Sequence, residues 1–162
     1  MVVKDPSRLV EVMRYLKSEL RFDLLLDIAG VDHGEDQPRF EVVYHLYSFA
    51  TQQYLRVKTR VREGTPELPT LCPVWKAANW HEREVFDMMG IRFTGHPDLR
   101  RILMWEGYPY HPLRKDFPLA GLTVDETVQP APMAGGPFVT SPAGQNTVDR
   151  EPQAKGETDS SV

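Results

Sequence analysis

Cysteine is nearly absent from the sequence, in which Cys72 is the single one among 162 residues. One cysteine excludes a disulfide within the chain and a metal cluster held by several of its own thiolates, and it fits a reducing compartment. We expect Cys72 to be a small buried apolar residue. Long hydrophobic runs are missing too, since no stretch approaches the ~20 apolar residues that a membrane span requires. We therefore expect no direct membrane span.

Basic residues are scarce relative to acidic ones. The sequence has 19 Lys and Arg against 23 Asp and Glu, which gives a formal net charge of -4 and a pI near 5.7. Such a chain lacks the positive charge that neutralises phosphates, so nucleic acid is not an expected partner. An RNA-binding module built on the basic alternation from Arg56 to Arg62 is the weakest alternative. A solvent-exposed strand face is the better interpretation of that alternation.

Familiar catalytic motifs are missing as well. Neither a G-x-G-x-x-G nor a G-x-x-x-x-G-K-[ST] pattern occurs, so nothing indicates a phosphate cradle. The serines lie mostly in a predicted helix or near the C-terminus, where a triad of serine, histidine and acid has no support. We expect no catalytic and no cofactor-binding residue in this chain.

What the sequence does contain is regular periodicity. Apolar residues recur at helical spacing after the capping residue Asp5 and again before Gly90, and they alternate at strand spacing in between. The predicted elements are helix 6–20, strands 22–28, 40–48 and 54–62, helix 80–89 and strand 91–94. The first strand should stop at Gly30, with Leu24, Leu26 and Ile28 on one face. This order predicts an α+β fold, a small mixed or antiparallel sheet with helices packed on one face.

The second predicted helix has recognisable ends. Asn79 and Glu82 have the spacing of a capping box, and Gly90 is a typical helix stop. Within the helix, Arg83 and Asp87 stand four residues apart and should form an ion pair.

Residues 96–119 combine aromatic and basic side chains between prolines and lack periodicity. Proline excludes long helices and central strands, and aromatic residues with arginine are enriched at protein interface hot spots. The tail that follows has five prolines, five glycines and one aromatic residue, too little apolar surface to order by itself. We predict an α+β domain over 1–95, an interface segment over 96–119 and a Pro/Gly-rich extended tail over 120–162.

An independent metalloenzyme is an alternative of another class. His81 and Glu84 stand three residues apart on the predicted helix, a spacing that can bring two metal ligands together, and His96 and His111 follow. The chain supplies neither a second such pair nor a third long helix. We therefore expect no metal site.

Three stretches, AANWHEREVFDMMGI, GHPDLRRILM and HPLRKDFPL, strongly resemble the 30 kDa subunit of respiratory complex I, a family of NADH:quinone oxidoreductase subunits. The helix and strands before them follow the order of that family's small α+β domain. The resemblance spans roughly residues 1 to 119. The tail has no motif that matches.

The resemblance implies a cofactor-free structural subunit of the hydrophilic arm of proton-pumping NADH:quinone oxidoreductase, peripheral on the cytoplasmic side of the bacterial inner membrane. It implies contact with the 49 kDa-type subunit of the quinone site and with neighbouring iron-sulfur subunits. Iron-sulfur clusters, FMN and quinone would belong to those partners, and translocase activity to the whole complex. With the aromatic and basic residues of 96–119, the signature gives these fold and interface positions: Trp80, Glu82, Arg83, Glu84, Asp87, Gly90, His96, Arg100, Arg101, Trp105, Tyr108, Arg114, Lys115 and Asp116.

The nearest alternative to complex I is the equivalent subunit of a membrane-bound nickel-iron hydrogenase or formate hydrogenlyase complex. The sequence separates the two poorly, because both would use the same fold and the same contacts.

Overall fold

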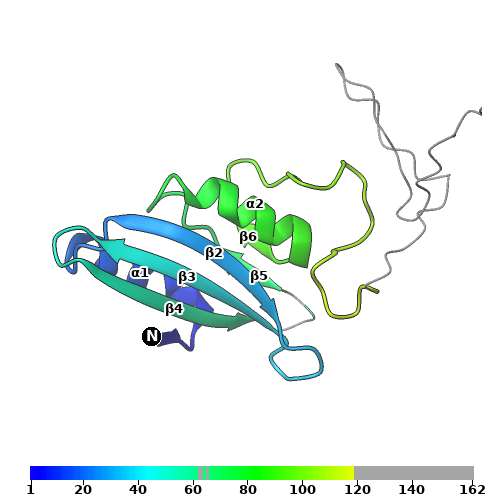
Figure 1. The fold of residues 1–162 in the computed structure, drawn as a ribbon, viewed down its shortest axis with the longest axis horizontal. Coiled ribbons are helices and arrows are strands. Elements are labelled where there is room, and N and C mark those ends of the chain that lie inside the picture. The colour runs from blue at the N-terminus through cyan, green and yellow to red at the C-terminus, as the bar shows by residue number, and fades with distance from the viewer. Residues whose placement is uncertain (62–63, 65, 119–162) are drawn as a thin grey trace, which may run out of the picture. The chain divides into compact units, whose positions relative to one another are not determined.

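The computed structural model describes residues 1–61, 64 and 66–118 (Figure 1). In chain order the elements are β1 (Val2–Val3), the short 3-10 helix η1 (Pro6–Arg8), α1 (Leu9–Ser18), β2 (Leu24–Asp32), β3 (Phe40–Ser48), β4 (Gln53–Val61), β5 (Glu67–Pro69), α2 (Ala78–Met89) and β6 (Arg92–Thr94). The predicted tail over 120–162 lies outside the described residues, as does Arg62 of the basic alternation.

Within the described residues, four strands form one sheet in the order β1-β4-β3-β2, and β5 pairs with β6. The pairs β2–β3 and β3–β4 are antiparallel, whereas β1–β4 and β5–β6 are parallel. The predicted mixed α+β fold is confirmed. The sequence pattern missed β1 and β5 because two and three residues are too few to show an alternation.

The core lies on one face of the sheet. Alternate residues of β3 from Phe40 to Leu46 have no exposed surface, and both helices add apolar side chains to the same cluster. Helix α2 comes so close to β2 that a Cβ on Gly30 would lie 2.8 Å from Cγ of Met89. Gly30 is therefore a contact point with α2 and not the end of its strand. Both helices cover the same face, as predicted (Figure 1).

Strand β2 departs from the predicted alternation. Its register with β3 shifts between Leu25 and Asp27, as at a β-bulge. Leu25 and Ile28 are buried in consequence, while Leu26 is 40% exposed. The predicted place of Leu26 on the core face is wrong, because the irregularity turns its side chain outward.

The first helix starts as predicted, with the Asp5 carboxylate accepting the backbone N–H of Ser7 at 3.0 Å. Its first turn is the 3-10 helix η1, and α1 ends at Ser18, two residues before the predicted end. Among the helices described, none is long and apolar enough to cross a membrane.

Of the two predicted ends of α2, the C-terminal one is confirmed and the N-terminal cap is not. The helix begins at Ala78 with no side-chain cap, so the predicted capping box of Asn79 and Glu82 is wrong. The Glu82 carboxylate is used elsewhere, as described below. The predicted stop is confirmed: Gly90 has φ 72°, a left-handed conformation that suits glycine, and its N–H donates to the carbonyl of Phe86 at 2.9 Å.

Candidate functional site

The segment after β6, described over residues 96–118, folds back against the C-terminal end of α2. Leu113 donates its backbone N–H to the carbonyl of Met88 at 3.1 Å, and Arg114 donates from Nε to the carbonyl of Met89 at 2.7 Å. The last carbonyls of a helix have no partner inside it, and a positive side chain near them is favourable. The segment therefore caps α2.

Asp87 is the main anchor of the segment on α2. Its side chain has no exposed surface, and its Oδ2 accepts three successive backbone N–H groups, from Ile102, Leu103 and Met104, at 3.0, 2.7 and 2.9 Å. Its Oδ1 accepts Nη1 of Arg101 at 2.6 Å. Burial by itself raises the pKa of Asp87, but these donors together outweigh burial and lower it. Asp87 is a framework residue that cannot reach a partner itself.

Two arginines tie the segment across the helix. Arg101 also donates to the carbonyls of Asp87 and Tyr110, each at 3.1 Å. Arg83 donates from Nε and Nη2 to the carbonyls of Arg100 and Arg101, each at 3.2 Å. The predicted Arg83–Asp87 ion pair is therefore wrong, because each of the two side chains finds its partner in the segment instead.

The far end of the segment is held at the β2–β3 turn. The Asp32 carboxylate accepts hydrogen bonds from Nε and Nη2 of Arg39, both at 2.8 Å, and from the backbone N–H of Lys115, also at 2.8 Å. Asp116 lies 3.1 Å from Nη2 of Arg39. The Arg39 guanidinium holds the pKa of the Asp32 carboxyl well below its usual range. Sequence patterns did not predict this anchor, although an acid that ends one strand and a base that opens the next were a visible signal.

Gly90 leaves room for the capping side chains. A Cβ at this position would lie 2.5 Å from Nε2 of His111 and would also overlap the end of the Arg114 side chain. The Nδ1 of His111 is 2.9 Å from the carbonyl of Asp87. Burial lowers the pKa of His111, which favours the neutral ring.

The outer surface of the segment is aromatic and aliphatic. The rings of Trp105 and Tyr108 lie 4.5 Å apart, those of Tyr108 and Tyr110 5.7 Å apart, both pairs edge to face. Tyr108 is buried, whereas Leu103 and Leu113 are 59% and 62% exposed. Leu103 and Leu113 therefore leave apolar surface exposed on the same segment as the aromatic cluster.

The first turns of α2 present a second exposed group. Trp80 is 61% exposed, and the Arg83 guanidinium lies 5.1 Å from its ring centre. His81 is 3.4 Å from Asp27 of β2. Glu84 is exposed and has no hydrogen-bond or ion-pair partner among the residues described.

Glu82 points the other way, into the protein, and has no exposed surface. Its Oε2 is 2.5 Å from the Thr70 hydroxyl, and its Oε1 accepts the backbone N–H of Leu71 at 2.6 Å. Sγ of Cys72 and Nε2 of His96 lie 3.7 and 3.9 Å from Oε2. Burial raises the pKa of Glu82 to about 7. Cys72 is only partly buried, and burial raises the pKa of its thiol.

Cys72, Glu82 and His96 form a group of three possible metal ligands in the described part of the chain, with ligand atoms within 4.8 Å of one another. The Nδ1 of His96 accepts the backbone N–H of Asp98 at 3.0 Å. In a neutral ring the proton then sits on Nε2, which faces the carbonyl of Asn79 at 3.2 Å. That nitrogen offers no lone pair, so the group is not a preformed metal site.

The four side chains of the metalloenzyme alternative are not brought together. Of them, only His96 belongs to the group just described. His81 contacts Asp27, His111 contacts a carbonyl at the end of α2, and Glu84 is exposed. The geometry gives no support to that alternative.

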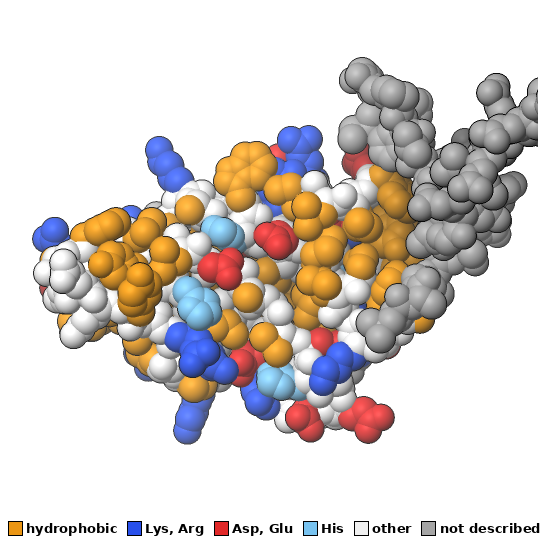
Figure 2. Space-filling view, in the orientation of Figure 1, with side chains coloured by type: hydrophobic (Ala, Val, Ile, Leu, Met, Phe, Trp, Pro, Cys, Tyr) orange, Lys and Arg blue, Asp and Glu red, His pale blue; other side chains and the backbone are white. Residues whose placement is uncertain are grey.

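Some basic side chains on the open face of the sheet and beside α2 are neutralised locally. Lys58 and Arg60 of the basic alternation lie 2.8 and 3.4 Å from the Glu41 carboxylate. The exposed Arg100 side chain is 2.9 Å from Asp98. Figure 2 shows acidic, basic and histidine side chains intermixed on the visible face. This distribution does not favour phosphate backbones.

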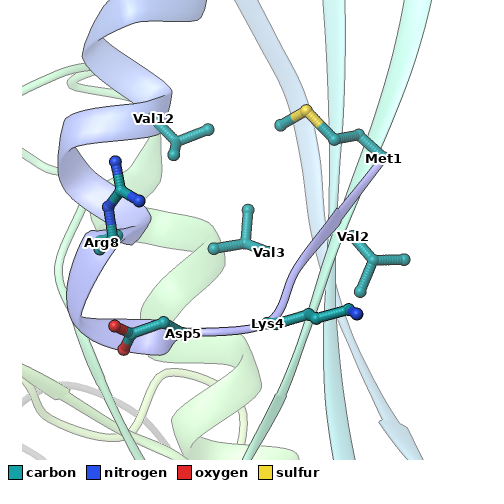
Figure 3. A pocket seen from close by; sticks show the side chains of 7 residues that line it. All are labelled: Met1, Val2, Val3, Lys4, Asp5, Arg8 and Val12. Atoms are coloured by element: carbon teal, nitrogen blue, oxygen red, sulfur yellow. The ribbon is translucent and has the colours of Figure 1, made fainter.

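A separate depression of 360 Å³ lies between β1 and α1 (Figure 3). Its lining residues are Met1, Val2, Val3, Lys4, Asp5, Arg8 and Val12. None of the predicted site residues lines it, and its walls combine aliphatic side chains with Lys4, Asp5 and Arg8.

Comparison with known proteins gives a consistent result. A family model described as the 30 kDa subunit of the respiratory-chain NADH dehydrogenase matches residues 2–123. The chain is 58% identical over 118 residues to the NADH-quinone oxidoreductase C 2 subunit of Rhizobium meliloti, covering 72% of this chain and 64% of that relative. It is 50% identical over 120 residues to the corresponding C-type subunit of Geotalea uraniireducens, covering 74% and 73%. The match thus spans less than two thirds of the length of the Rhizobium protein.

Two solved structures resemble the fold. One is a trypsin-resistant fragment of Nqo5, with 39% identity and a TM-score of 0.56, covering 60% of this chain and 80% of that one. The other belongs to the membrane-bound sulfane sulfur reductase, an archaeal respiratory membrane complex, with 29% identity and a TM-score of 0.65, covering 73% and 70%.

Proposed function

Because the chain belongs to the 30 kDa subunit family of respiratory-chain NADH dehydrogenase, we propose that it is a structural subunit of the hydrophilic arm of NADH:quinone oxidoreductase. It holds the quinone-reducing module by contact with a 49 kDa-type subunit and with neighbouring iron-sulfur subunits. The complex would place it peripherally on the cytoplasmic side of the bacterial inner membrane. The names of the relatives support the complex, and the geometry around α2 supports the structural role.

The observation that carries this proposal is the use of the charged signature residues inside the chain. Asp87, Arg101 and Arg83 all bind the segment to α2, and Glu82 is buried. A catalytic group needs access to a substrate, whereas these side chains already form hydrogen bonds within the protein. They hold a rigid surface, and its exposed members are available to a partner: Trp80, Glu84, Leu103 and Leu113.

The chain's own side chains are poor candidates for carrying electrons. Iron-sulfur clusters are typically held by four thiolates, and this sequence has one cysteine. In our proposal, the clusters, FMN and quinone belong to the partner subunits, and oxidoreductase activity belongs to the assembled complex.

A second candidate function follows from the structural neighbour in the sulfane sulfur reductase complex. The occurrence of this fold in a second membrane-bound respiratory complex supports, as the alternative, the equivalent subunit of a nickel-iron hydrogenase or formate hydrogenlyase complex. Purifying the tagged full chain from its host distinguishes the two, because its companions would be NADH-oxidising subunits in one case and the large hydrogenase subunit in the other.

Two substitutions separate the framework from the contact surface. Glu84→Ala should leave the unfolding of the isolated chain unchanged, because Glu84 is exposed, yet it should weaken complex recovery by about 1 to 2 kcal/mol, roughly five- to thirtyfold in affinity. Arg101→Ala should also destabilise the chain itself, because it leaves Asp87 without its arginine. The measurements are the melting temperature of each chain, the amount of assembled complex, and NADH:quinone activity per assembled complex.

The matched control is Glu11→Ala, the same change on the exposed face of α1, where the side chain is 70% exposed. It should assemble like the wild type. Full assembly of the Glu84 or Arg101 variant with lost activity per complex would contradict a structural role and indicate a direct part in the reaction.

A further inference from the structure

Glu82 differs in its partners from the other buried acids of the residues that the structure describes, Asp32, Glu41 and Asp87. Asp32 and Asp87 each contact an arginine, at 2.8 and 2.6 Å. In the described part of the chain, the nearest basic group to Glu82 is the His96 ring, at 3.9 Å. A buried carboxylate without a paired cation is costly when ionised. The protein has therefore buried Glu82 in surroundings that favour its neutral form.

The hydrogen bonds of Glu82 suit both protonation states. The Thr70 hydroxyl accepts the backbone N–H of Cys72 at 3.1 Å and still has one lone pair and one hydrogen available. The two oxygens lie 2.5 Å apart, and the hydroxyl can donate to the ionised Oε2 or accept from a protonated one. The bond from Leu71 to Oε1 persists in either state. A proton can therefore bind and leave without a change of partners.

Three titratable side chains lie near Glu82, and they come from three different parts of the fold. Tyr44 of β3 is fully buried, and its hydroxyl has no hydrogen-bond partner among the described residues. Burial, and after it the Glu82 charge, raises the pKa of Tyr44. Cys72 after β5 has a pKa that burial raises. His96 after β6 accepts a backbone N–H at Nδ1, as a neutral ring does. None of these groups offsets a negative charge.

We propose that Glu82 is a buried proton-binding site of the folded chain, a role beyond the structural function proposed above. The protonated carboxyl fastens α2 to the Thr70–Cys72 turn, and loss of the proton above neutral pH weakens this attachment. The contribution to stability is full below pH 4.5, the usual value for a free glutamate, and it is lost as the pH rises through about 7.

Urea unfolding of the full-length chain between pH 4.5 and 9 tests this. The pKa of about 7 lies about 2.5 units above 4.5, and a free carboxyl is half ionised at pH 4.5. The folding equilibrium of the wild type should therefore fall by about 150-fold over this range through Glu82. Glu82→Gln should lack this component, because its amide can accept from Leu71 and donate to Thr70 without titrating. Equal pH dependence of wild type and Glu82→Gln would overturn the proposal.

The matched control is Glu84→Gln, the same change at an exposed position on the same helix, which should keep the wild-type pH dependence. A second measurement needs no variant and holds even if Glu82→Gln does not fold. In wild-type protein labelled with carbon-13 in its glutamates, one side-chain carboxyl should titrate with a midpoint near pH 7. Titration of all glutamates below about pH 5.5 would contradict the proposal.

Discussion

Replacing Asp87 with alanine should lower the free energy of unfolding by about 3 to 5 kcal/mol and release residues 100–118 from α2. The substitution leaves three backbone N–H groups and the Arg101 guanidinium without their shared acceptor. Unmade hydrogen bonds of partly buried donors are costly. Calorimetry of the full chain should show a melting temperature lower by roughly 10 °C or more.

A released segment should also become a protease substrate. Trypsin cleavage after Arg114 or Lys115 should accelerate in the Asp87→Ala chain, because the bonds that hold these residues to α2 and Asp32 depend on the docked segment. Asp98→Ala is the control, since among the described residues the Asp98 carboxylate pairs only with the exposed Arg100 side chain. A loss of less than about 1 kcal/mol in Asp87→Ala would show that the segment is held mainly by its apolar contacts.

Gly90→Ala should cost about 3 kcal/mol for two separate reasons. The left-handed φ of 72° is strained for alanine by roughly 1 to 2 kcal/mol. The added methyl group would also displace His111 and Arg114, which give the terminal carbonyls of α2 their partners. Each lost hydrogen bond adds about 1 kcal/mol. Denaturant unfolding of the purified chain measures the sum.

Gly107→Ala isolates the first of these two terms. Gly107 also has a positive φ, 88°, but a Cβ there would meet no atom of the described residues within 4 Å. The difference between the two variants is then the cost of crowding at the end of α2. Equal losses would mean that His111 and Arg114 move aside freely, and that their bonds to the helix contribute little.

Local patterns in the sequence predicted what is decided locally. The alternation along β3 placed Phe40, Val42, Tyr44 and Leu46 on the core face, where all four are fully buried. Gly90 ended α2 as predicted, because a left-handed residue after a helix depends on its own backbone. The order of elements and the family resemblance were also sufficient to predict the fold class.

Side-chain partners far apart in the chain were not predictable in this way. Spacing favoured an Arg83–Asp87 pair, but the donors to Asp87 lie 14 to 17 residues away. The capping-box pattern of Glu82 was equally misleading, since Thr70 and Leu71 approach it from a different element. A spacing rule describes an isolated helix, and tertiary contacts override it when a buried carboxylate finds better donors.

The irregularity in β2 shows a different limit of prediction from sequence, which concerns the face of the strand that each side chain occupies. A shift of one residue exchanges the two faces of a strand, and nothing in the run Leu24, Leu25 and Leu26 marks which leucine faces outward. The exposed position of Leu26 was visible only after the pairing of β2 with β3 was known.

The hydrogen bond from the Lys115 backbone N–H to the Asp32 carboxylate joins residues 83 positions apart in the chain. This separation bears on the order in which parts of the protein fold. We expect that bond to form after the β2–β3 hairpin and α2, because contacts between residues far apart in the chain cost more loop-closure entropy than local ones. During synthesis the segment is also made after the residues that it binds, so the strands of the sheet leave the ribosome before the segment does. Docking of the segment should then follow the folding transition state, and Asp87→Ala should speed unfolding while leaving the rate of refolding nearly unchanged.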